Sequence, residues 1–152
     1  MQIGVIGTGY VGLVAGVCLA DAGNLVTCVD SDPEKVRALH RGEVPIYEPG
    51  LAAVLRRVER EHRITFTTNH AEAVKGADAV FLAVGTPEGD DGSPDLTAFH
   101  SATRACLRAV DCPTVFVLKS TVPVGTAAWV KNEVEHLAAH PVAVVNNPEF
   151  LK

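Results

Sequence analysis

The chain has few features of a membrane, metal-binding or disulfide-stabilised protein. No apolar run is long enough to span a bilayer, and Met1–Ile6 shows neither a basic stretch nor a cleavage site, so we expect no membrane partner and no signal peptide. The four cysteines lie far apart and form no CxxC pair, which predicts buried or half-buried free thiols in a reducing cytoplasm. The six histidines show no ligand spacing such as HExxH, so we expect no metal site.

Positive charge is also scarce. Lysine and arginine number 13 against 18 aspartates and glutamates, which leaves a net charge of −5 over 152 residues. Nucleic-acid binding requires a basic face, so the predicted partners do not include nucleic acid. The 47% hydrophobic and 20% charged content is that of a globular protein, and the length fits one domain. An acidic domain can still bind a phosphorylated cofactor through backbone N–H groups at a helix N-terminus.

Strand and helix signals alternate along the chain. Apolar runs rich in β-forming residues predict strands at Gln2–Ile6, Leu25–Val29, Ile64–Thr67, Ala79–Val84, Thr114–Leu118 and Val142–Val145. Helices are expected between them at Tyr10–Asp21, Pro33–Arg41, Leu51–Glu61, Ala71–Lys75, Asp95–Val110 and Thr126–Ala139, with loops at Val44–Gly50 and Gly85–Pro94. We therefore predict an α/β fold: a Rossmann-like, doubly wound parallel sheet of about six strands with helices on both faces.

A glycine-rich turn, Gly7-Thr8-Gly9-Tyr10-Val11-Gly12, joins the first strand to the first helix. In that context a GxGxxG pattern indicates a dinucleotide site. The first glycine permits the tight turn, the second lets the backbone approach a pyrophosphate, and the third lets helix and strand pack closely. The N–H groups near Tyr10 and Val11 then point at the phosphates. A plain strand–helix turn that binds nothing is the alternative.

An acidic residue follows the second strand. Asp30 lies 18 residues after Gly12, close to the spacing of about 20 expected for the carboxylate that accepts hydrogen bonds from the adenosine ribose. A negative charge there disfavours a 2′-phosphate, so the predicted cofactor is NAD rather than NADP. Lys35 could reach the ribose or a phosphate, although an ordinary surface lysine fits its spacing equally well. A solvated cap is the alternative for Asp30.

Polar residues also follow three later strands, at Thr86, Ser120-Thr121 and Glu149. Ligands of open α/β sheets bind at the carboxyl ends of strands, so these residues extend the predicted site. Two of these positions have a simpler interpretation as well: Ser120-Thr121 fit a helix-capping pair, and Glu149 fits a solvated loop carboxylate. The segment Tyr47–Gly50 likewise fits a plain turn that leads into the next helix.

Five motifs carry a resemblance to a known family. They are GTGYVGL at Gly7–Leu13, PIYEPGL at Pro45–Leu51, VGTP at Val84–Pro87, KSTVPVGT at Lys119–Thr126 and NPEFL at Asn147–Leu151. In this order they resemble the N-terminal NAD-binding domain of the UDP-glucose/GDP-mannose dehydrogenase family, over essentially the whole chain. Pro45–Leu51 and Asp91–Leu96 are most similar to the UDP-glucose 6-dehydrogenase branch.

The resemblance implies an oxidation in which two NAD molecules convert the C6 alcohol of UDP-glucose to the carboxylate of UDP-glucuronate. It implies cofactor contacts at Gly7, Gly9, Tyr10, Val11, Gly12, Asp30, Lys35, Thr86, Pro87 and Thr121. Glu149 matches the family's general base or water-activating glutamate, and Thr121 the threonine that helps hold the catalytic water. The segment that begins to bind the UDP-sugar matches Glu149, Phe150, Leu151 and Lys152.

The family's nucleophilic cysteine and its catalytic lysine and asparagine are expected beyond residue 152, with the central helix and the C-terminal UDP-sugar-binding domain. We therefore expect residues 1–152 to be one NAD-binding Rossmann domain, inactive alone, of a protein that is homodimeric at full length. GDP-mannose and UDP-N-acetylmannosamine dehydrogenases are alternatives, because the sugar is recognised mostly by later residues. A non-catalytic NAD-binding module is another alternative. Tyr47–Gly50 and Asn147–Leu151 argue against a 6-phosphogluconate or 3-hydroxyacid dehydrogenase.

Overall fold

The computed structural model describes residues 1–90 and 92–150. The predicted substrate residues Leu151 and Lys152 lie outside this range, as does Asp91. The described strands are β1 (Gln2–Ile6), β2 (Leu25–Val29), β3 (Ile64–Thr67), β4 (Ala79–Leu82), β5 (Thr114–Leu118) and β6 (Val142–Asn146). The described helices are α1 (Tyr10–Asp21), α2 (Pro33–His40), α3 (Leu51–Arg60), α4 (His70–Val74), α5 (Thr97–Arg108) and α6 (Thr126–Leu137).

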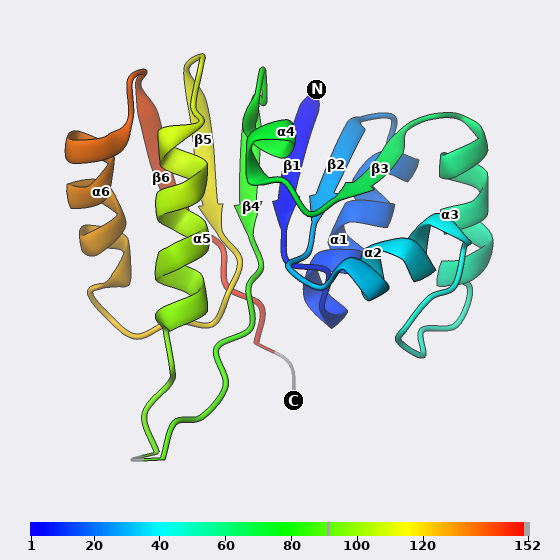
Figure 1. Ribbon diagram of the computed structural model, residues 1–152, viewed down its shortest axis with the longest axis horizontal. Helices are drawn as coiled ribbons and strands as arrows, with labels where there is room; N and C mark the ends of the chain where they lie inside the picture. Colours follow the sequence, from blue (N-terminus) through cyan, green and yellow to red (C-terminus); the bar gives the residue numbers. More distant parts are fainter. Residues whose placement is uncertain (91, 151–152) are drawn as a thin grey trace.

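The six strands form one parallel sheet in the order β3-β2-β1-β4-β5-β6 (Figure 1). This is the doubly wound arrangement, and it confirms the predicted fold class. The chain first winds from β1 outward to β3, then crosses back and winds from β4 to β6. The strand order therefore reverses between β1 and β4.

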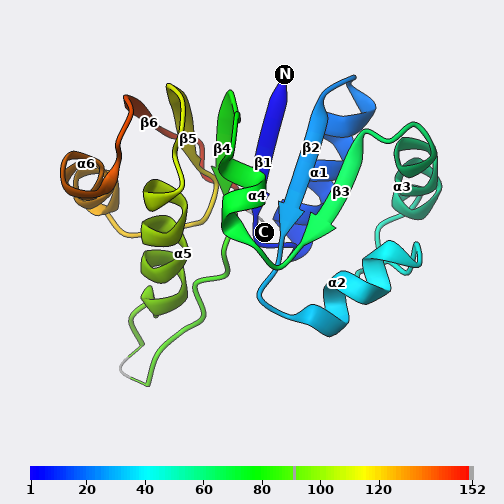
Figure 2. The same cartoon turned by 45° about the horizontal axis from the view of Figure 1, so that its top comes forward.

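Two apolar cores cover the two faces of the sheet. On one face α1, α2 and α3 pack through residues such as Leu13, Leu39 and Leu55. On the other face α4, α5 and α6 pack through residues such as Phe99 and Val130, and Figure 2 shows these helices on the same side. Because successive strand residues point to opposite faces, a sheet covered on both sides needs apolar residues at nearly every strand position.

Several element ends differ from their predicted positions. Strand β4 ends at Leu82 rather than Val84, because the amides of Lys119 and Ser120 both donate to the Leu82 carbonyl at 2.9 Å and the regular ladder stops there. Helix α5 begins at Thr97, since the carboxylate of Asp95 accepts from the Thr97 amide at 2.8 Å from outside the helix.

The four cysteines are free thiols, as predicted. Cys28 and Cys106 are buried and Cys112 is half-buried, but Cys18 is exposed, so that part of the prediction was wrong. Cys18 lies on the outward side of α1, away from Val17 and Ala20, which face the core.

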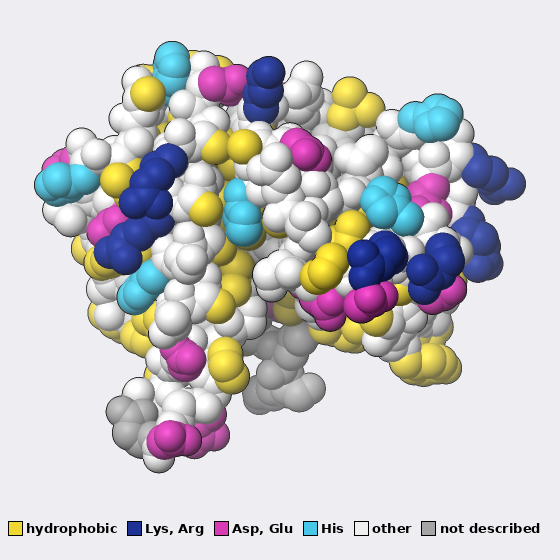
Figure 3. Space-filling model, viewed as in Figure 1, with side chains coloured by type: hydrophobic (Ala, Val, Ile, Leu, Met, Phe, Trp, Pro, Cys, Tyr) yellow, Lys and Arg dark blue, Asp and Glu magenta, His cyan; other side chains and the backbone are white. Residues whose placement is uncertain are grey.

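Within the described residues no helix is long and apolar enough to cross a membrane. On the face seen in Figure 3, lysines and arginines are interspersed with acidic residues and histidines.

Backbone hydrogen bonds continue past the ends of the strands at the carboxyl edge of the sheet. The Gly7 amide donates to the Val29 carbonyl at 2.8 Å, and the Asp30 amide donates to the Thr67 carbonyl at 3.1 Å. On the other side, the Asn147 amide donates to the Leu118 carbonyl at 3.0 Å. Neighbouring loops are thus joined in the same order as the strands from which they emerge.

Candidate functional site

Two adjoining hollows lie at this edge, where the strand order reverses. The larger has a volume of about 560 Å³ and lies beside Asp30, and the smaller has about 200 Å³ and lies beside Glu149. Four residues line both hollows, namely Gly9, Ala83, Val84 and Gly85. The two hollows therefore form one elongated crevice at the position where open α/β sheets bind dinucleotides.

The three glycines of the turn meet different surroundings. Gly7 has a φ of +98°, and a Cβ placed on it would lie 2.5 Å from the Ala83 carbonyl oxygen. A Cβ on Gly12 would lie 1.9 Å from the Gly7 carbonyl oxygen. A Cβ on Gly9 would meet nothing within 4 Å. The protein's own packing thus requires the first and third glycines, while the second leaves open space in front of α1.

Helix α1 begins in that open space at Tyr10. Gly9 is its N-cap and provides no side-chain acceptor, and the first turn carries no acidic residue. The first N–H groups of a helix lack intrahelical partners and carry partial positive charge, so an anion is stabilised there. The start of α1, with Tyr10 and Val11 lining the smaller hollow, can therefore hold a pyrophosphate.

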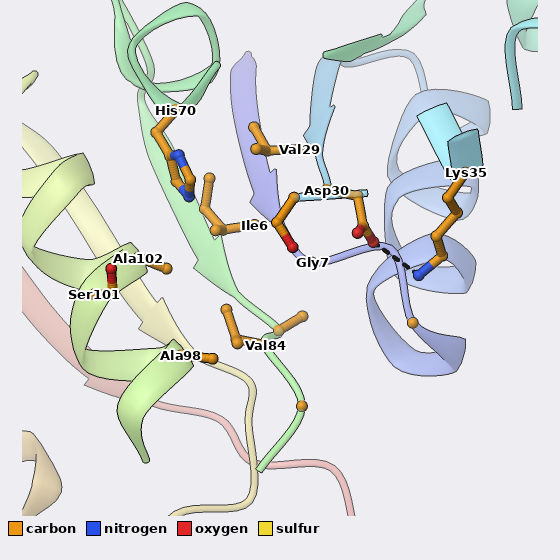
Figure 4. A pocket seen from close by; sticks show the side chains of 14 residues that line it. Ile6, Gly7, Val29, Asp30, Lys35, His70, Val84, Ala98, Ser101 and Ala102 are labelled. Carbon is orange, nitrogen blue, oxygen red and sulfur yellow. Dashed lines mark hydrogen bonds and ion pairs between the residues drawn. The ribbon is translucent and has the colours of Figure 1, made fainter. Parts of the chain in front are cut away.

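Asp30 lies at the far side of the larger hollow. One of its carboxylate oxygens accepts from the Thr8 hydroxyl at 2.6 Å and from the Thr8 amide at 3.1 Å. The same oxygen accepts from the Lys35 ammonium at 2.7 Å (Figure 4). The other oxygen accepts from the Asp32 amide at 3.1 Å. Burial acts to raise the pKa of Asp30, but the hydrogen bonds from Lys35, Thr8 and Asp32 outweigh it, so the pKa is lowered. The carboxylate is held ionised and in a fixed orientation.

The structure brings three of the predicted polar residues together beside the smaller hollow. The Thr86 hydroxyl donates to the Thr121 carbonyl at 3.0 Å, and the Thr121 hydroxyl donates to the Glu149 carbonyl at 2.9 Å. The Glu149 carboxylate accepts from the Lys119 ammonium at 2.5 Å. Ser120 is buried beneath them, with its hydroxyl 2.7 Å from the Val84 carbonyl oxygen.

Other predicted residues lie apart from this group. Pro87 is exposed and lines neither hollow, and its carbonyl accepts from the Asp95 amide at 2.7 Å. Phe150 is 77% exposed beside a third hollow of about 270 Å³ that is also lined by Val124. Within Tyr47–Gly50, the Glu48 carboxylate accepts from the Tyr10 hydroxyl, and this hydrogen bond raises the pKa of Tyr10.

The sequence reasoning missed several residues of the crevice, among them His70, Ser101 and Lys119. His70 and Ser101 line the larger hollow, but no motif or spacing marks them. Lys119 lines the smaller hollow and directly follows a strand, so its position could have identified it in the way that Thr121 was identified. Among the described residues, no group of three or more histidines, cysteines, aspartates or glutamates could hold a metal ion.

Comparisons with known proteins agree with this geometry. Residues 1–152 match the family model described as "UDP-glucose/GDP-mannose dehydrogenase family, NAD binding domain". The chain is 47% identical to a UDP-glucose 6-dehydrogenase of Pseudomonas aeruginosa, over the whole chain and 35% of that protein. It is 44% identical to UDP-glucose 6-dehydrogenase TuaD of Bacillus subtilis, over 99% of the chain and 33% of that protein.

Solved structures give the same result. A UDP-glucose dehydrogenase from the archaeon Pyrobaculum islandicum matches with a TM-score of 0.91 and 41% identity, over 99% of this chain and 36% of that one. A GDP-mannose dehydrogenase from Pseudomonas aeruginosa matches with a TM-score of 0.94 and 34% identity, over the whole of this chain and 37% of that one. The chain spans about a third of the length of the curated relatives it matches.

Proposed function

The chain belongs to the UDP-glucose/GDP-mannose dehydrogenase family, and on that premise we propose that it is the cofactor-binding part of an enzyme that oxidises UDP-glucose to UDP-glucuronate. NAD is its cofactor. The observation that supports the proposal best is the single crevice that has Asp30 at one end and Glu149 at the other, joined at Gly9.

In this proposal the two ends of the crevice hold the two halves of the dinucleotide. The start of α1 binds the pyrophosphate, with Gly7 and Gly12 shaping the turn and Gly9 leaving room for the phosphates. The Asp30 carboxylate accepts hydrogen bonds from the adenosine ribose, assisted by Lys35. A 2′-phosphate would meet that charge at close range, which favours NAD over NADP.

The other half of the dinucleotide then lies in the smaller hollow. This hollow is lined by Tyr10, Val11, Thr86 and Thr121. We retain Pro87 only as a neighbouring contact, since it lines neither hollow. NAD supplies the hydride acceptor at this end.

We propose Glu149 and Thr121 as the catalytic residues of this chain. The Lys119 ammonium donates to the Glu149 carboxylate at 2.5 Å and so fixes its position beside the hollow, where the carboxylate can accept a proton from water or from the sugar alcohol. The Thr121 hydroxyl donates to the Glu149 backbone, so its oxygen lone pairs are left to accept from a water molecule. Phe150, with Leu151 and Lys152, would begin the contact with the UDP-sugar.

The remaining parts of the proposal concern the whole protein. We propose residues 1–152 as one NAD-binding domain, followed in the full protein by a UDP-sugar-binding domain that supplies the nucleophilic cysteine, in a cytoplasmic homodimer. The relatives named as UDP-glucose dehydrogenases share 36–47% identity with the chain, while the GDP-mannose dehydrogenase shares 34%. The higher identities, of 41–47%, all belong to relatives named for UDP-glucose, which favours UDP-glucose over GDP-mannose as the substrate.

Titration calorimetry of the 152-residue chain tests cofactor binding. NAD and NADH are expected to bind, and NADP about tenfold or more weakly, a difference of roughly 1.4 kcal/mol. Asp30→Ala should weaken NAD binding, whereas Asp95→Ala, which removes an exposed carboxylate outside the crevice, should not. No binding of NAD at millimolar concentration would refute the proposal, and equal affinity for NADP would refute the role of Asp30.

A further inference from the structure

The larger hollow contains a histidine to which the cofactor contacts above give no role. His70, the first residue of α4, projects toward Ile6 and Val29 (Figure 4). Within residues 1–90 and 92–150, no protein group forms a hydrogen bond with either nitrogen of its ring. Other histidines differ: the His40 ring lies 2.9 Å from the Phe66 carbonyl oxygen. The half-buried His70 ring therefore has both nitrogens available to a ligand.

The rest of the hollow has the surface that a flat heterocycle requires. Apart from the charged pair at Asp30, its walls are mainly apolar, and they include Ile6, Val29, Val84, Ala98 and Ala102. Its volume of about 560 Å³ is within the range of small-molecule sites. Apolar walls can pack against the two faces of a base, while polar groups are needed only where its nitrogen-rich edge lies.

A second uncommitted polar group lies at the rim of the hollow. Ser101 is on α5, between Ala98 and Ala102 (Figure 4), and its hydroxyl has no protein partner among the described residues. Two residues later, the Thr103 hydroxyl instead donates to the Phe99 carbonyl of its own helix at 2.8 Å. The Ser101 hydroxyl, like the His70 ring, is thus available to form a hydrogen bond with a ligand.

Few charges face His70. Asp30 and Lys35 are the charged residues among those that line the hollow, and they are paired with each other at 2.7 Å. On α4 itself Glu72 is exposed, and the residues of α5 that line the hollow are uncharged. Because the one carboxylate that lines the hollow is paired with Lys35, burial determines the direction of the shift: it lowers the pKa of His70, so the ring is neutral at neutral pH. A neutral imidazole offers one donor and one acceptor.

We propose that His70 is the residue that recognises the adenine base of NAD, by hydrogen bonding to the base edge while the apolar walls pack against its faces. The proposal rests on the function proposed above, because the ribose held by Asp30 carries the base, and the hollow beside Asp30 is the one that contains His70. Ser101 contributes a weaker contact at the rim.

The first test separates the two halves of the cofactor. ADP-ribose carries the adenine half with no nicotinamide, and nicotinamide mononucleotide carries the other half. At neutral pH, His70→Ala should weaken ADP-ribose binding about tenfold, as expected for the loss of a hydrogen bond in a partly buried site. The variant should leave nicotinamide mononucleotide binding unchanged. His136→Ala, an exposed histidine on α6, is the matched control and should change neither.

The second test uses pH. The wild-type affinity for ADP-ribose should fall as the pH drops below about 6.5, the ordinary pKa of a histidine, because the pKa of His70 is lowered from that value and protonating the ring in a hollow closed by the ligand costs desolvation of the charge. ADP-ribose has no phosphate monoester to titrate in that range. His70→Asn keeps a donor and an acceptor but cannot titrate, so it should bind within about threefold of wild type at neutral pH, a difference under roughly 0.7 kcal/mol, and show no such pH dependence.

The outcomes are distinguishable. If wild type binds ADP-ribose and His70→Ala binds it equally well, or if His70→Asn keeps the wild-type pH dependence, the role of His70 is refuted while NAD binding stands. If wild type binds neither ADP-ribose nor NAD, the proposed function itself is refuted, and the role of His70 with it.

Discussion

Replacing Gly9 with alanine should separate cofactor binding from folding. The backbone of Gly9 has a φ of −68° and a ψ of −171°, which alanine adopts without strain. An added Cβ would meet nothing within 4 Å in the protein, but it would stand at the N-terminus of α1, where the pyrophosphate is proposed to bind. We expect a folded protein that has lost most of its affinity for NAD.

The magnitude follows from two opposing effects on stability. Alanine restricts the unfolded chain, which stabilises by about 0.4–1 kcal/mol, and it is a poorer N-cap than glycine by a similar amount. The free energy of unfolding should therefore change by less than about 1 kcal/mol. Gly12→Ala is the contrasting variant, because its Cβ would lie 1.9 Å from the Gly7 carbonyl oxygen, whereas real contacts of this kind almost never fall below 3.0 Å. Overpacking of that severity should cost about 3 kcal/mol.

Urea unfolding and calorimetry with NAD measure the two effects on the same samples. Gly9→Ala should unfold at the same urea concentration as wild type but bind NAD weakly. Gly12→Ala should unfold at a clearly lower urea concentration. Gly9→Ala that binds NAD like wild type would show that no phosphate approaches the turn at this position. A loss of more than about 2 kcal/mol in Gly9→Ala would contradict the assignment of its role to the ligand.

Two further predictions concern stability. Because the pKa of Asp30 is lowered in the folded state, its ionised carboxylate stabilises the fold above its unfolded pKa of about 3.9, and this contribution is lost as the pH falls through the lower folded value. Urea unfolding between about pH 6 and 2 should show a smaller loss of stability for Asp30→Asn than for wild type; parallel curves would contradict this. Ser120→Ala should cost about 1–2 kcal/mol at neutral pH, because the Val84 carbonyl loses its buried donor, while Ser101→Ala should cost almost nothing. Equal stability of the two serine variants would argue against this reasoning.

The strands could be predicted from the sequence because their composition reflects burial on both faces. β1, β2, β3 and β5 have the predicted bounds, since apolar runs such as Thr114–Leu118 end where the chain leaves the sheet. β4 was predicted two residues too long, because Ala83 and Val84 are as apolar as the strand itself. These two residues are apolar because they line the crevice, and composition alone does not distinguish a crevice wall from a strand interior.

The predicted site shows the same limit. Asp30, Thr86, Thr121 and Glu149 were found because each follows a strand, and parallel strands bring their carboxyl ends to one edge. His70 comes instead from a helix that crosses over the sheet, so its position depends on how α4 packs against β1 and β2. Tertiary packing of this kind leaves no period or spacing in the sequence from which it could be predicted.

The backbone links between neighbouring loops at the carboxyl edge have a consequence for the energetics of binding. Because the Gly7, Asp30 and Asn147 amides are already bonded to adjacent strands, the loops that line the crevice are ordered when the sheet forms. A ligand then binds without the conformational entropy loss of ordering flexible loops, about 1–2 kcal/mol for each backbone residue. Hydrogen exchange at these three amides should therefore be slow in the free protein, close to that of the strands themselves.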